Sequence, residues 1–195
     1  MGEEIPDWER TKVANQIFIE PILEVYSVLE QRAKIQAHNP NVLCFNIALS
    51  DFDGVGEFHI SSGSFCSSSL LDFKKESVRY GLEFQTAEIR KVPTRTLDSM
   101  VDEGIIDLSL YNLLYVDVQG CEQRLMKGAE RSLQKIDMVF VEVNFFGIYE
   151  GCTLWPDFKV YMQSQGFRLV NLRTKENTQS TQGEALFFNQ NFKWK

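Results

Sequence analysis

Three short apolar stretches of this chain end in or contain an acidic residue. They are residues 16–20 (QIFIE), 113–117 (LLYVD) and 138–143 (MVFVEV), whose acids are Glu20, Asp117 and Glu142. Apolar runs of this length between polar segments are typical of buried strands. In open α/β sheets, ligands bind in the crevice outside the carboxyl ends of the strands. The sequence therefore predicts that the three carboxylates line one crevice, where the chemistry of the protein takes place.

Asp117 is the first candidate for catalysis. It stands inside the apolar stretch 113–118, and a carboxylate buried there is costly unless a partner or a ligand compensates it. Such a group could orient a hydroxyl, remove its proton as a general base, or hold a divalent ion that does so. Gly120 would let the backbone approach a ligand closely, or would only make the turn from strand to helix. Glu122 could bind an acceptor molecule, or only stabilise the positive end of the following helix.

Glu142 ends the next expected strand and should face the same crevice as Asp117. We predict a catalytic role for Glu142 and acceptor binding for Asn144, with a solvated position at a strand end as the alternative for both. In the loop that follows, Tyr149 and Trp155 could form an aromatic wall for an acceptor or could pack at the surface.

The elements that would position these residues alternate between strand and helix. Strands are expected at 16–20, 42–49, 113–118 and 138–143, and helices after the first and third of them show apolar side chains at helical spacing. The two apolar faces consist of Ile22, Val25, Leu29 and Ala33, and of Leu125, Met126, Ala129 and Leu133. A further helix runs to Gly166. Two closing strands, 167–172 and 184–189, are joined without a helix, so the sheet is predicted to be mainly parallel with an antiparallel hairpin at its edge.

The segment between residues 50 and 95 gives weaker signals. Residues 55–60 alternate after the turn at 51–54 and are expected to pair back onto the strand 42–49. The serine-rich residues 61–69 are not expected to pack in a core, and residues 70–92 show no clear period, so this region is predicted to be the most mobile. A short helix should start at Thr96, and Gly128 should permit close packing of a helix on the sheet.

The composition limits the class of protein. A chain of 195 residues with 44% hydrophobic residues is expected to form one domain, 16–195, after an N-terminal arm at 1–15. A net charge of −7 with scattered basic residues excludes a nucleic-acid-binding surface and favours a small-molecule partner. The four cysteines form no pair at short spacing, and no apolar run has the length of a membrane span, so we expect reduced thiols and a cytoplasmic protein without a membrane partner. His38 and His59 stand at no metal-ligand spacing, and no metal site is predicted.

Six motifs occur in an order that points to one family. They are residues 17–21 (IFIEP), 46–51 (NIALSD), 96–98 (TLD), 116–122 (VDVQGCE), 125–129 (LMKGA) and 141–143 (VEV). From about residue 16 to the end, the chain resembles the FkbM family of S-adenosylmethionine-dependent methyltransferases. The resemblance implies a Rossmann-like class I methyltransferase fold, an α/β three-layer sandwich with a mostly parallel sheet, and S-adenosylmethionine as the cofactor.

The resemblance also implies roles on the cofactor side. Glu20 would accept hydrogen bonds from the ribose hydroxyls, with a solvated strand-end position as the alternative. Adenine would lie against Ala48, Leu49, Ser50 and Asp51. Asp51 would face the adenine amino group, or would only make the turn before Gly54. Asp117 and Gly120 would lie beside the methyl group that is transferred.

One part of the family's fold has no counterpart in this sequence, namely the first strand and the glycine-rich turn that hold the methionine part of the cofactor. A βαβ unit needs about 30 residues or more, whereas only residues 1–15 precede the first expected strand. We therefore expect an N-terminally truncated fold without its central strand, which would lie between 16–20 and 113–118. A partner chain in a homo-oligomer, or the arm 1–15, could fill the gap.

The leading hypothesis is a methyltransferase that methylates a hydroxyl of a small molecule or a sugar, with the acceptor oxygen attacking the methyl group in line. The alternative is a catalytically inactive remnant that serves as a binding or interaction module, which the missing glycine-rich turn favours. A nicotinamide-dependent enzyme is excluded, because no Gly-x-Gly-x-x-Gly follows a strand.

Overall fold

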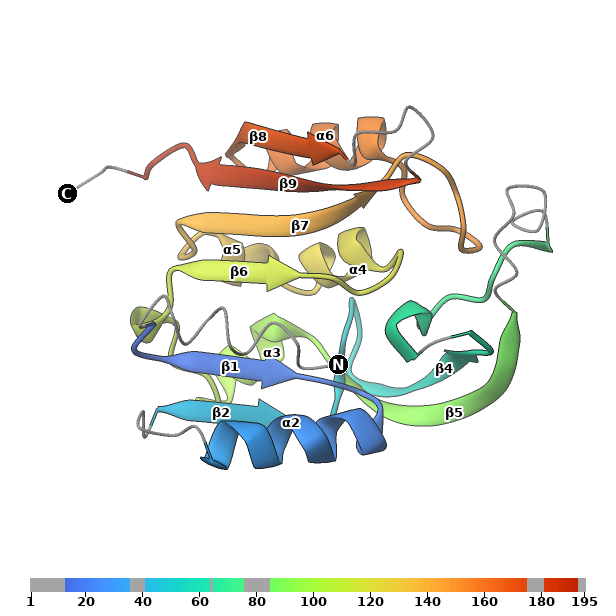
Figure 1. Cartoon of the computed structure of the whole chain (residues 1–195). Coiled ribbons are helices and arrows are strands. Elements are labelled where there is room, and N and C mark those ends of the chain that lie inside the picture. Colours follow the sequence, from blue (N-terminus) through green and yellow to red (C-terminus); the bar gives the residue numbers. More distant parts are fainter. Residues whose placement is uncertain (1–12, 36–40, 64, 76–84, 175–180, 193–195) are drawn as a thin grey trace.

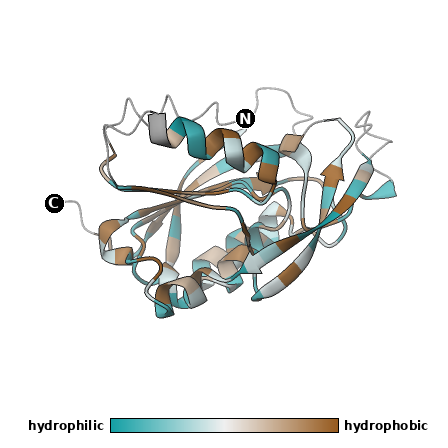
Figure 2. Cartoon of the chain, turned by 90° about the horizontal axis from the view of Figure 1, so that it is seen from below, coloured by the Kyte–Doolittle hydropathy of each residue, from teal (hydrophilic) through white to brown (hydrophobic). Residues whose placement is uncertain are grey.

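The computed structural model describes residues 13–35, 41–63, 65–75, 85–174 and 181–192, and it shows an α/β fold with mixed sheets (Figure 1). The strands of these residues form three sheets. The pair β1-β2 lies beside a four-stranded sheet in the order β6-β7-β9-β8, and the third sheet has the order β3-β5-β4. In the view from below (Figure 2), α2 covers one face of the strands and the other helices lie on the opposite face.

The first unit is the strand-helix-strand segment that the sequence predicts. β1 (Gln16–Ile19) and β2 (Val42–Phe45) are parallel, and α2 (Leu23–Ile35) connects them. The predicted apolar face is confirmed, since its members Ile22, Val25, Leu29 and Ala33 are all buried. The single strand expected at 42–49 is two strands, because β2 ends at Phe45 and β3 (Ala48–Leu49) joins another sheet.

The four-stranded sheet holds most of the core. β6 (Leu113–Val116) runs parallel to β7 (Met138–Asn144), whereas β9 (Gln182–Asn189) is antiparallel to both β7 and β8 (Phe167–Thr174). The predicted C-terminal hairpin is thereby confirmed. Side chains with no exposed surface gather around this sheet, and they include Met126, Ala129, Leu133, Val139, Val141, Met162, Phe167, Ala185 and Phe187.

The helix expected after the third strand is interrupted. It consists of α4 (Glu122–Lys127) and α5 (Glu130–Leu133), with Gly128 in the break. A Cβ on Gly128 would lie 1.9 Å from the carbonyl oxygen of Ser50. Only glycine allows this approach, so the close packing predicted for Gly128 is confirmed. The next helix, α6 (Trp155–Ser164), begins with a proline in its first turn and packs on β7 and β8.

The three-stranded sheet differs from the expectation. β4 (Gly54–Ser61) pairs antiparallel with β5 (Thr86–Arg95), and β5 pairs parallel with β3. The prediction that 55–60 returns along 42–49 was wrong, and the ten-residue strand β5 was missed. On β5 only Val92 and Thr94 are buried while most of its other side chains meet solvent, so the strand shows no apolar period. Residues 76–84 lie outside the described part of the chain.

The serine-rich tract packs more closely than expected. It contains the short 3₁₀ helix Phe65–Ser67, and Ser68 and Ser69 are only 5% and 0% exposed. The backbone of Ser69 pairs with that of His59 in both directions, at 2.7 and 3.1 Å. The prediction that this tract cannot pack was wrong for Ser61, Ser68 and Ser69, because backbone groups satisfy the hydroxyls of Ser68 and Ser69, whereas Ser62, Gly63 and Cys66 are exposed. Ser64 is not among the described residues.

The predicted single, mostly parallel sheet is replaced by three sheets. Parallel pairs are β1-β2, β3-β5 and β6-β7, and antiparallel pairs are β4-β5, β7-β9 and β8-β9. Within the described residues, β1 and β6 form no ladder with each other although both line one cavity, at the place where the central strand was expected to be missing. The arm 1–15 lies largely outside the described residues, so its role as a filler stays a prediction. No helix in the described ranges is long and apolar enough to cross a membrane.

Candidate active site

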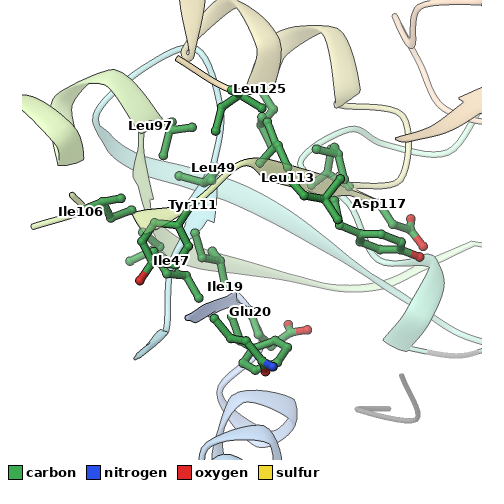
Figure 3. A pocket seen from close by; sticks show the side chains of 18 of the residues that line it. Ile19, Glu20, Ile47, Leu49, Leu97, Ile106, Tyr111, Leu113, Asp117 and Leu125 are labelled. Atoms are coloured by element: carbon green, nitrogen blue, oxygen red, sulfur yellow. The ribbon is translucent and has the colours of Figure 1, made fainter. Parts of the chain in front are cut away.

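A large cavity runs along β1 and β6, and we call it the central cavity. Its volume of about 1500 Å³ exceeds the roughly 300–1,000 Å³ of most ligand pockets. Most of its wall is apolar, with Ile19, Ile47, Leu49, Leu97, Leu113 and Leu125 among the lining side chains (Figure 3). Glu20 and Asp117 also line it, each just beyond the carboxyl end of its strand. The structure therefore brings these two predicted site residues into one cavity.

Glu20 is half-buried at the end of β1. Its Oε1 accepts a hydrogen bond from the Ile22 N–H at 2.7 Å, and burial raises the pKa of its carboxyl above the ordinary value. The side chain of Asn46 donates to the carbonyl oxygens of Glu20 and Pro21, at 2.8 and 3.1 Å. A carboxylate offers about four acceptor positions, so Glu20 can accept further hydrogen bonds from a ligand in the cavity.

Of the four residues expected beside adenine, two line the central cavity and two do not. Ala48 and Leu49 are buried and line the central cavity, whereas Ser50 is fully buried and does not line it. Asp51 is also absent from the lining, and Arg124 binds it with Nε 3.0 Å from Oδ1. Burial raises the pKa of Asp51, but hydrogen bonds from Arg124 and Ser50 outweigh this effect and leave the pKa below its ordinary value.

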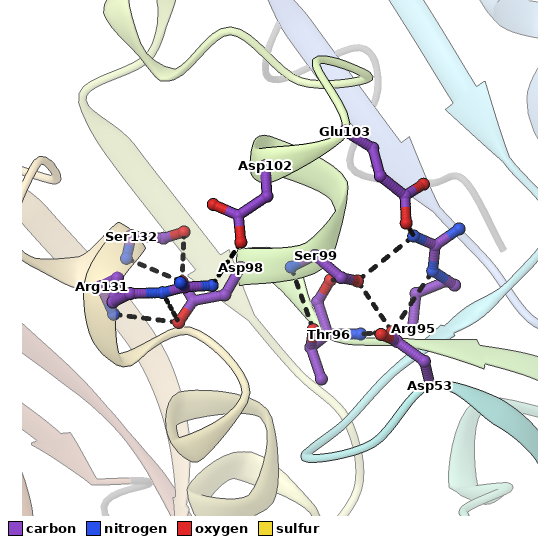
Figure 4. A network of polar contacts seen from close by, with 9 residues as sticks. All are labelled: Asp53, Arg95, Thr96, Asp98, Ser99, Asp102, Glu103, Arg131 and Ser132. Atoms are coloured by element: carbon purple, nitrogen blue, oxygen red, sulfur yellow. Dashed lines mark hydrogen bonds and ion pairs between the residues drawn. The ribbon is translucent and has the colours of Figure 1, made fainter.

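Polar networks fix the short helix α3 (Leu97–Asp102), whose first residue lines the cavity (Figure 4). The Oγ1 of Thr96 accepts from the Ser99 N–H at 3.0 Å, which confirms the predicted helix start. Asp53 accepts from the Thr96 N–H at 2.7 Å, and Asp98 accepts from the Ser132 N–H at 2.8 Å and its hydroxyl at 2.6 Å. These hydrogen bonds connect α3 to the turn before β4 at Asp53 and to α5 at Ser132.

Asp117 is exposed, not buried. β6 ends at Val116, so the next residue lies outside the strand, and the prediction of a buried carboxylate at 117 was wrong. The side-chain amide of Gln119 joins it to the neighbouring strand, because Nε2 donates to Asp117 Oδ1 at 2.5 Å and to Glu142 Oε2 at 3.2 Å. Gln182 on β9 donates to the same Glu142 oxygen at 2.7 Å. Gln119 therefore joins Asp117 to Glu142, but Glu142 lies two residues before the end of β7 and does not line the central cavity, so the prediction of one crevice holds for Glu20 and Asp117 only.

The costly buried carboxylate is Glu122, which is only 2% exposed. Its Oε1 accepts from the Gly120 N–H at 2.9 Å, and its Oε2 accepts from Nδ2 of Asn144, itself 1% exposed, at 3.1 Å. Burial raises the pKa of Glu122 to about 7, and the nearby charge of Asp117 adds to this effect. Neither Glu122 nor Asn144 lines the central cavity. Their predicted contact with an acceptor stays a prediction.

Tyr149 is a buried part of this site. It is 1% exposed, and its hydroxyl lies 2.7 Å from Oε1 of Gln119 and 3.0 Å from the carbonyl oxygen of Ser67. Gly120, with a φ of 92°, lies against its ring, where a Cβ would come within 2.8 Å of Cδ2. Of the two alternatives for Tyr149, the structure shows neither an exposed aromatic wall nor surface packing, but a buried ring behind residue 120.

Sequence reasoning gave no role to Gln119, Gln182 or Ser69, although all three take part in this arrangement. Gln119 stands in the motif at 116–122, which was the only available signal for it. Ser69 and Gln182 come from distant segments, and only the fold brings them near. Within the described ranges, no group of three or more His, Cys, Asp or Glu residues is placed to hold a metal ion.

Comparisons with known proteins agree with one another. The sequence profile described as "Methyltransferase FkbM domain" matches residues 5–169. The 2-O-methyltransferase NoeI of Sinorhizobium fredii (strain NBRC 101917 / NGR234) is 29% identical over 131 residues, which cover 61% of this chain and 53% of that protein. The chain thus spans about half the length of this curated relative.

A solved structure shows the same fold. The crystal structure of Methyltransferase FkbM from Methylobacillus flagellatus KT superposes with a TM-score of 0.56 and 16% sequence identity. The match covers 94% of this chain and 39% of that one. At this level of identity the likeness concerns the fold alone.

Proposed function

Because the chain belongs to the FkbM methyltransferase family, we propose that it catalyses the S-adenosylmethionine-dependent methylation of a hydroxyl group on a small molecule or a sugar. The observation that carries this proposal is the position of Glu20 and Asp117 in one cavity, with Glu142 bonded through Gln119 to Asp117. The name of the relative NoeI, a 2-O-methyltransferase, supports oxygen as the methylated atom.

The residues of the cavity fit the adenosine part of the cofactor. Glu20 provides a half-buried carboxylate for the two ribose hydroxyls, and Ala48 and Leu49 provide an apolar surface for adenine. Ser50 and Asp51 follow Leu49 in the chain but do not line the cavity, so a contact of Asp51 with the adenine amino group stays a proposal that requires Asp51 to turn toward the cavity. Gly120 faces the ring of Tyr149, so we assign it a place behind the transferred methyl group rather than in the cavity wall.

S-adenosylmethionine supplies, when it is bound, a methyl group that its sulfonium centre activates. The chain then has to hold the acceptor hydroxyl in line and accept its proton. Asp117 is exposed at the cavity and is our candidate for the general base, with Glu142 beside it to bind the acceptor and share the charge. Glu122 and Asn144 lie beneath these groups, and we propose that they support the backbone at Gly120.

Calorimetric titration with S-adenosylmethionine and its demethylated product, S-adenosylhomocysteine, tests the proposal directly. We expect saturable binding of both by the wild-type chain and binding weakened by about tenfold or more in the Glu20→Ala variant. Glu24→Ala is the matched control, because Glu24 lies on α2 near Glu20 but is exposed and paired with Arg90. If neither compound bound at millimolar concentration, the proposed methyltransferase activity would be contradicted. The alternative, a binding or interaction module, would then remain.

A further inference from the structure

One amide side chain contacts both carboxylates of the candidate site. We propose that Gln119 is a positioning residue, whose amide group holds Asp117 and Glu142 side by side and keeps both in the charged form that accepts a proton from the acceptor. The inference rests on the proposed function for its catalytic meaning. The amide bridge between the two carboxylates does not depend on that function, because it is argued from the contacts of Gln119 alone.

The geometry defines the bridge. Nε2 of Gln119 has two hydrogens, and it lies 2.5 Å from Oδ1 of Asp117 and 3.2 Å from Oε2 of Glu142. Ionised carboxylates only accept hydrogen bonds, so the nitrogen side of the amide must face them. On the other side, Oε1 of Gln119 lies 2.7 Å from the hydroxyl of Tyr149, which can donate. In this one orientation, both hydrogens on Nε2 and the oxygen Oε1 of Gln119 therefore have hydrogen-bond partners.

The backbone of Gln119 shows that this orientation is held against a local preference. Among the described residues it is the only non-glycine residue with a positive φ, at 52°. L-residues other than asparagine and aspartate rarely adopt this conformation, and an observed outlier of this kind is a reason to look for a function. The hydroxyl of Ser69 donates to the carbonyl oxygen of Gln119 at 2.7 Å and helps to fix the backbone.

The proximity of two carboxylates gives the amide bridge an electrostatic effect. Two carboxylates this close repel, and without donors one of them retains its proton to a higher pH. The titratable side chains near the pair include the buried Glu122 of α4, Cys121 before it and Tyr149 after β7, together with Glu184 of β9, which is opposite Glu142 and paired with Arg173. Burial and the charge of Glu142 raise the pKa of Tyr149, so its phenol stays a donor. The amide of Gln119 is thus a neutral donor that the two carboxylates share.

Gln182 offers a comparison within the same site. Its amide donates to Glu142 at 2.7 Å and approaches Oδ1 of Asn144 at 3.4 Å. A residue of the same type therefore contacts one carboxylate of the pair, while Gln119 contacts both. Gln182→Ala serves as the matched control for Gln119.

The test measures the titration of the two carboxyl groups by carbon-13 NMR in the wild-type chain and in two variants. Gln119→Gly removes the side chain at a position where glycine relieves the backbone, so folding is not at risk. Gln119→Met keeps the length of the side chain without its donors. In both variants we expect one carboxyl of the pair to release its proton about one pH unit or more above the wild-type value. In Gln182→Ala, the titration of Asp117 should stay as in the wild type.

Activity gives the second measurement. The acidic limb of the pH profile of kcat should move upward with the carboxyl titration in both Gln119 variants, while the KM for S-adenosylmethionine stays within about twofold. Unchanged carboxyl titration in both variants would overturn the inference, because a purely structural role leaves it unaffected. If the carboxyl titration shifted but the wild-type chain showed no methyl transfer, the amide bridge would be supported and the proposed function would be contradicted.

Discussion

Asn144 donates a hydrogen bond from Nδ2 to Oε2 of Glu122 at 3.1 Å, and both side chains are almost completely buried. This contact joins the end of β7 to the start of α4 directly under the carboxylates of the site. Because the pair is neutral only when Glu122 holds a proton, its charge depends on pH around the raised pKa of Glu122, about 7.

The raised pKa of Glu122 predicts that stability falls as the pH rises. In the unfolded chain the group has an ordinary pKa of 4.5, and in the folded chain its pKa is about 7. The folded state therefore binds more protons between these values, and its free energy of unfolding should decrease from about pH 4.5 to 7, by on the order of 2 to 4 kcal/mol. Glu122→Gln should remove most of this decrease, as measured by urea unfolding at several pH values.

Glu150→Gln is the control for this prediction, since it makes the same substitution at an exposed glutamate. If the Glu122→Gln variant loses stability with pH as steeply as the wild type, another group is responsible.

Replacement of Gly128 should be strongly destabilising. A Cβ at this position would lie 1.9 Å from the Ser50 carbonyl oxygen, so Gly128→Ala forces the backbone apart and should cost about 3 kcal/mol or more in free energy of unfolding. Gly104→Ala is the control, because nothing lies within 4 Å of its Cβ position and it has only the cost of a φ of 72°. That cost is about 1 to 2 kcal/mol. Equal losses in the two variants would argue against close packing at residue 128.

Substitutions at Asp117 and Glu20 should affect different quantities, turnover in the first case and cofactor affinity in the second. Asp117→Asn is expected to lower turnover by roughly 100-fold or more with little change in affinity for S-adenosylmethionine. Glu20→Ala should instead weaken binding by about 1.5 to 3 kcal/mol, since it removes a charged hydrogen-bond acceptor. Turnover and calorimetry on both variants check the division. Full turnover in Asp117→Asn together with lost affinity would contradict it.

Binding should also depend on pH through Glu20. Burial raises the pKa of this carboxyl, and the protonated form is a poorer acceptor for two hydroxyls. We therefore expect the affinity for S-adenosylmethionine to decline on acidification at a higher pH than an ordinary glutamate would cause. Calorimetry at several pH values measures this, and a Glu20→Gln variant whose affinity declined in the same way would show that another group titrates.

The central cavity predicts a chain of low stability or one that associates. Apolar side chains of β1 and β6 line a space of about 1500 Å³, and such space in a core lowers stability. Sedimentation velocity and thermal unfolding should show oligomers, or a monomer with a low melting temperature. A monomer that unfolds sharply at high temperature would show that the cavity is filled in solution.

The sequence predicted the elements whose residues follow one period. The buried face of α2 and the C-terminal hairpin were correct because burial on one side leaves a regular apolar pattern. β5 was missed because its exposed face carries charged residues that interrupt such a pattern. The separation into three sheets depends on pairings between distant strands, and no local period records these.

In the candidate site, the sequence located the carboxylates but misjudged their surroundings. The apolar residues before Asp117 made it look buried, whereas the strand ends one residue earlier and exposes it. For Glu122 the sequence left open acceptor binding or a charge at the helix start, and the structure shows a buried carboxylate bonded to Asn144 from a later strand. Burial at these positions is set by contacts across the fold, which residue types alone do not specify.

The absence of a ladder between β1 and β6 in the described residues divides the site between two structural units. β7 has neighbours on both sides, and its Val139 and Val141 have no exposed surface, so its amide hydrogens should exchange with solvent only on global unfolding. Among the described strands β1 pairs with β2 alone, and its side chains are half-buried, so we expect the amides of the β1-β2 pair to exchange at a lower opening free energy than those of β7. Glu20 stands on the unit that opens easily and Glu142 on the one that does not. A ligand that contacts both units would therefore hold them together. Its residence time would depend on how often β1 opens, and not on the more stable four-stranded sheet.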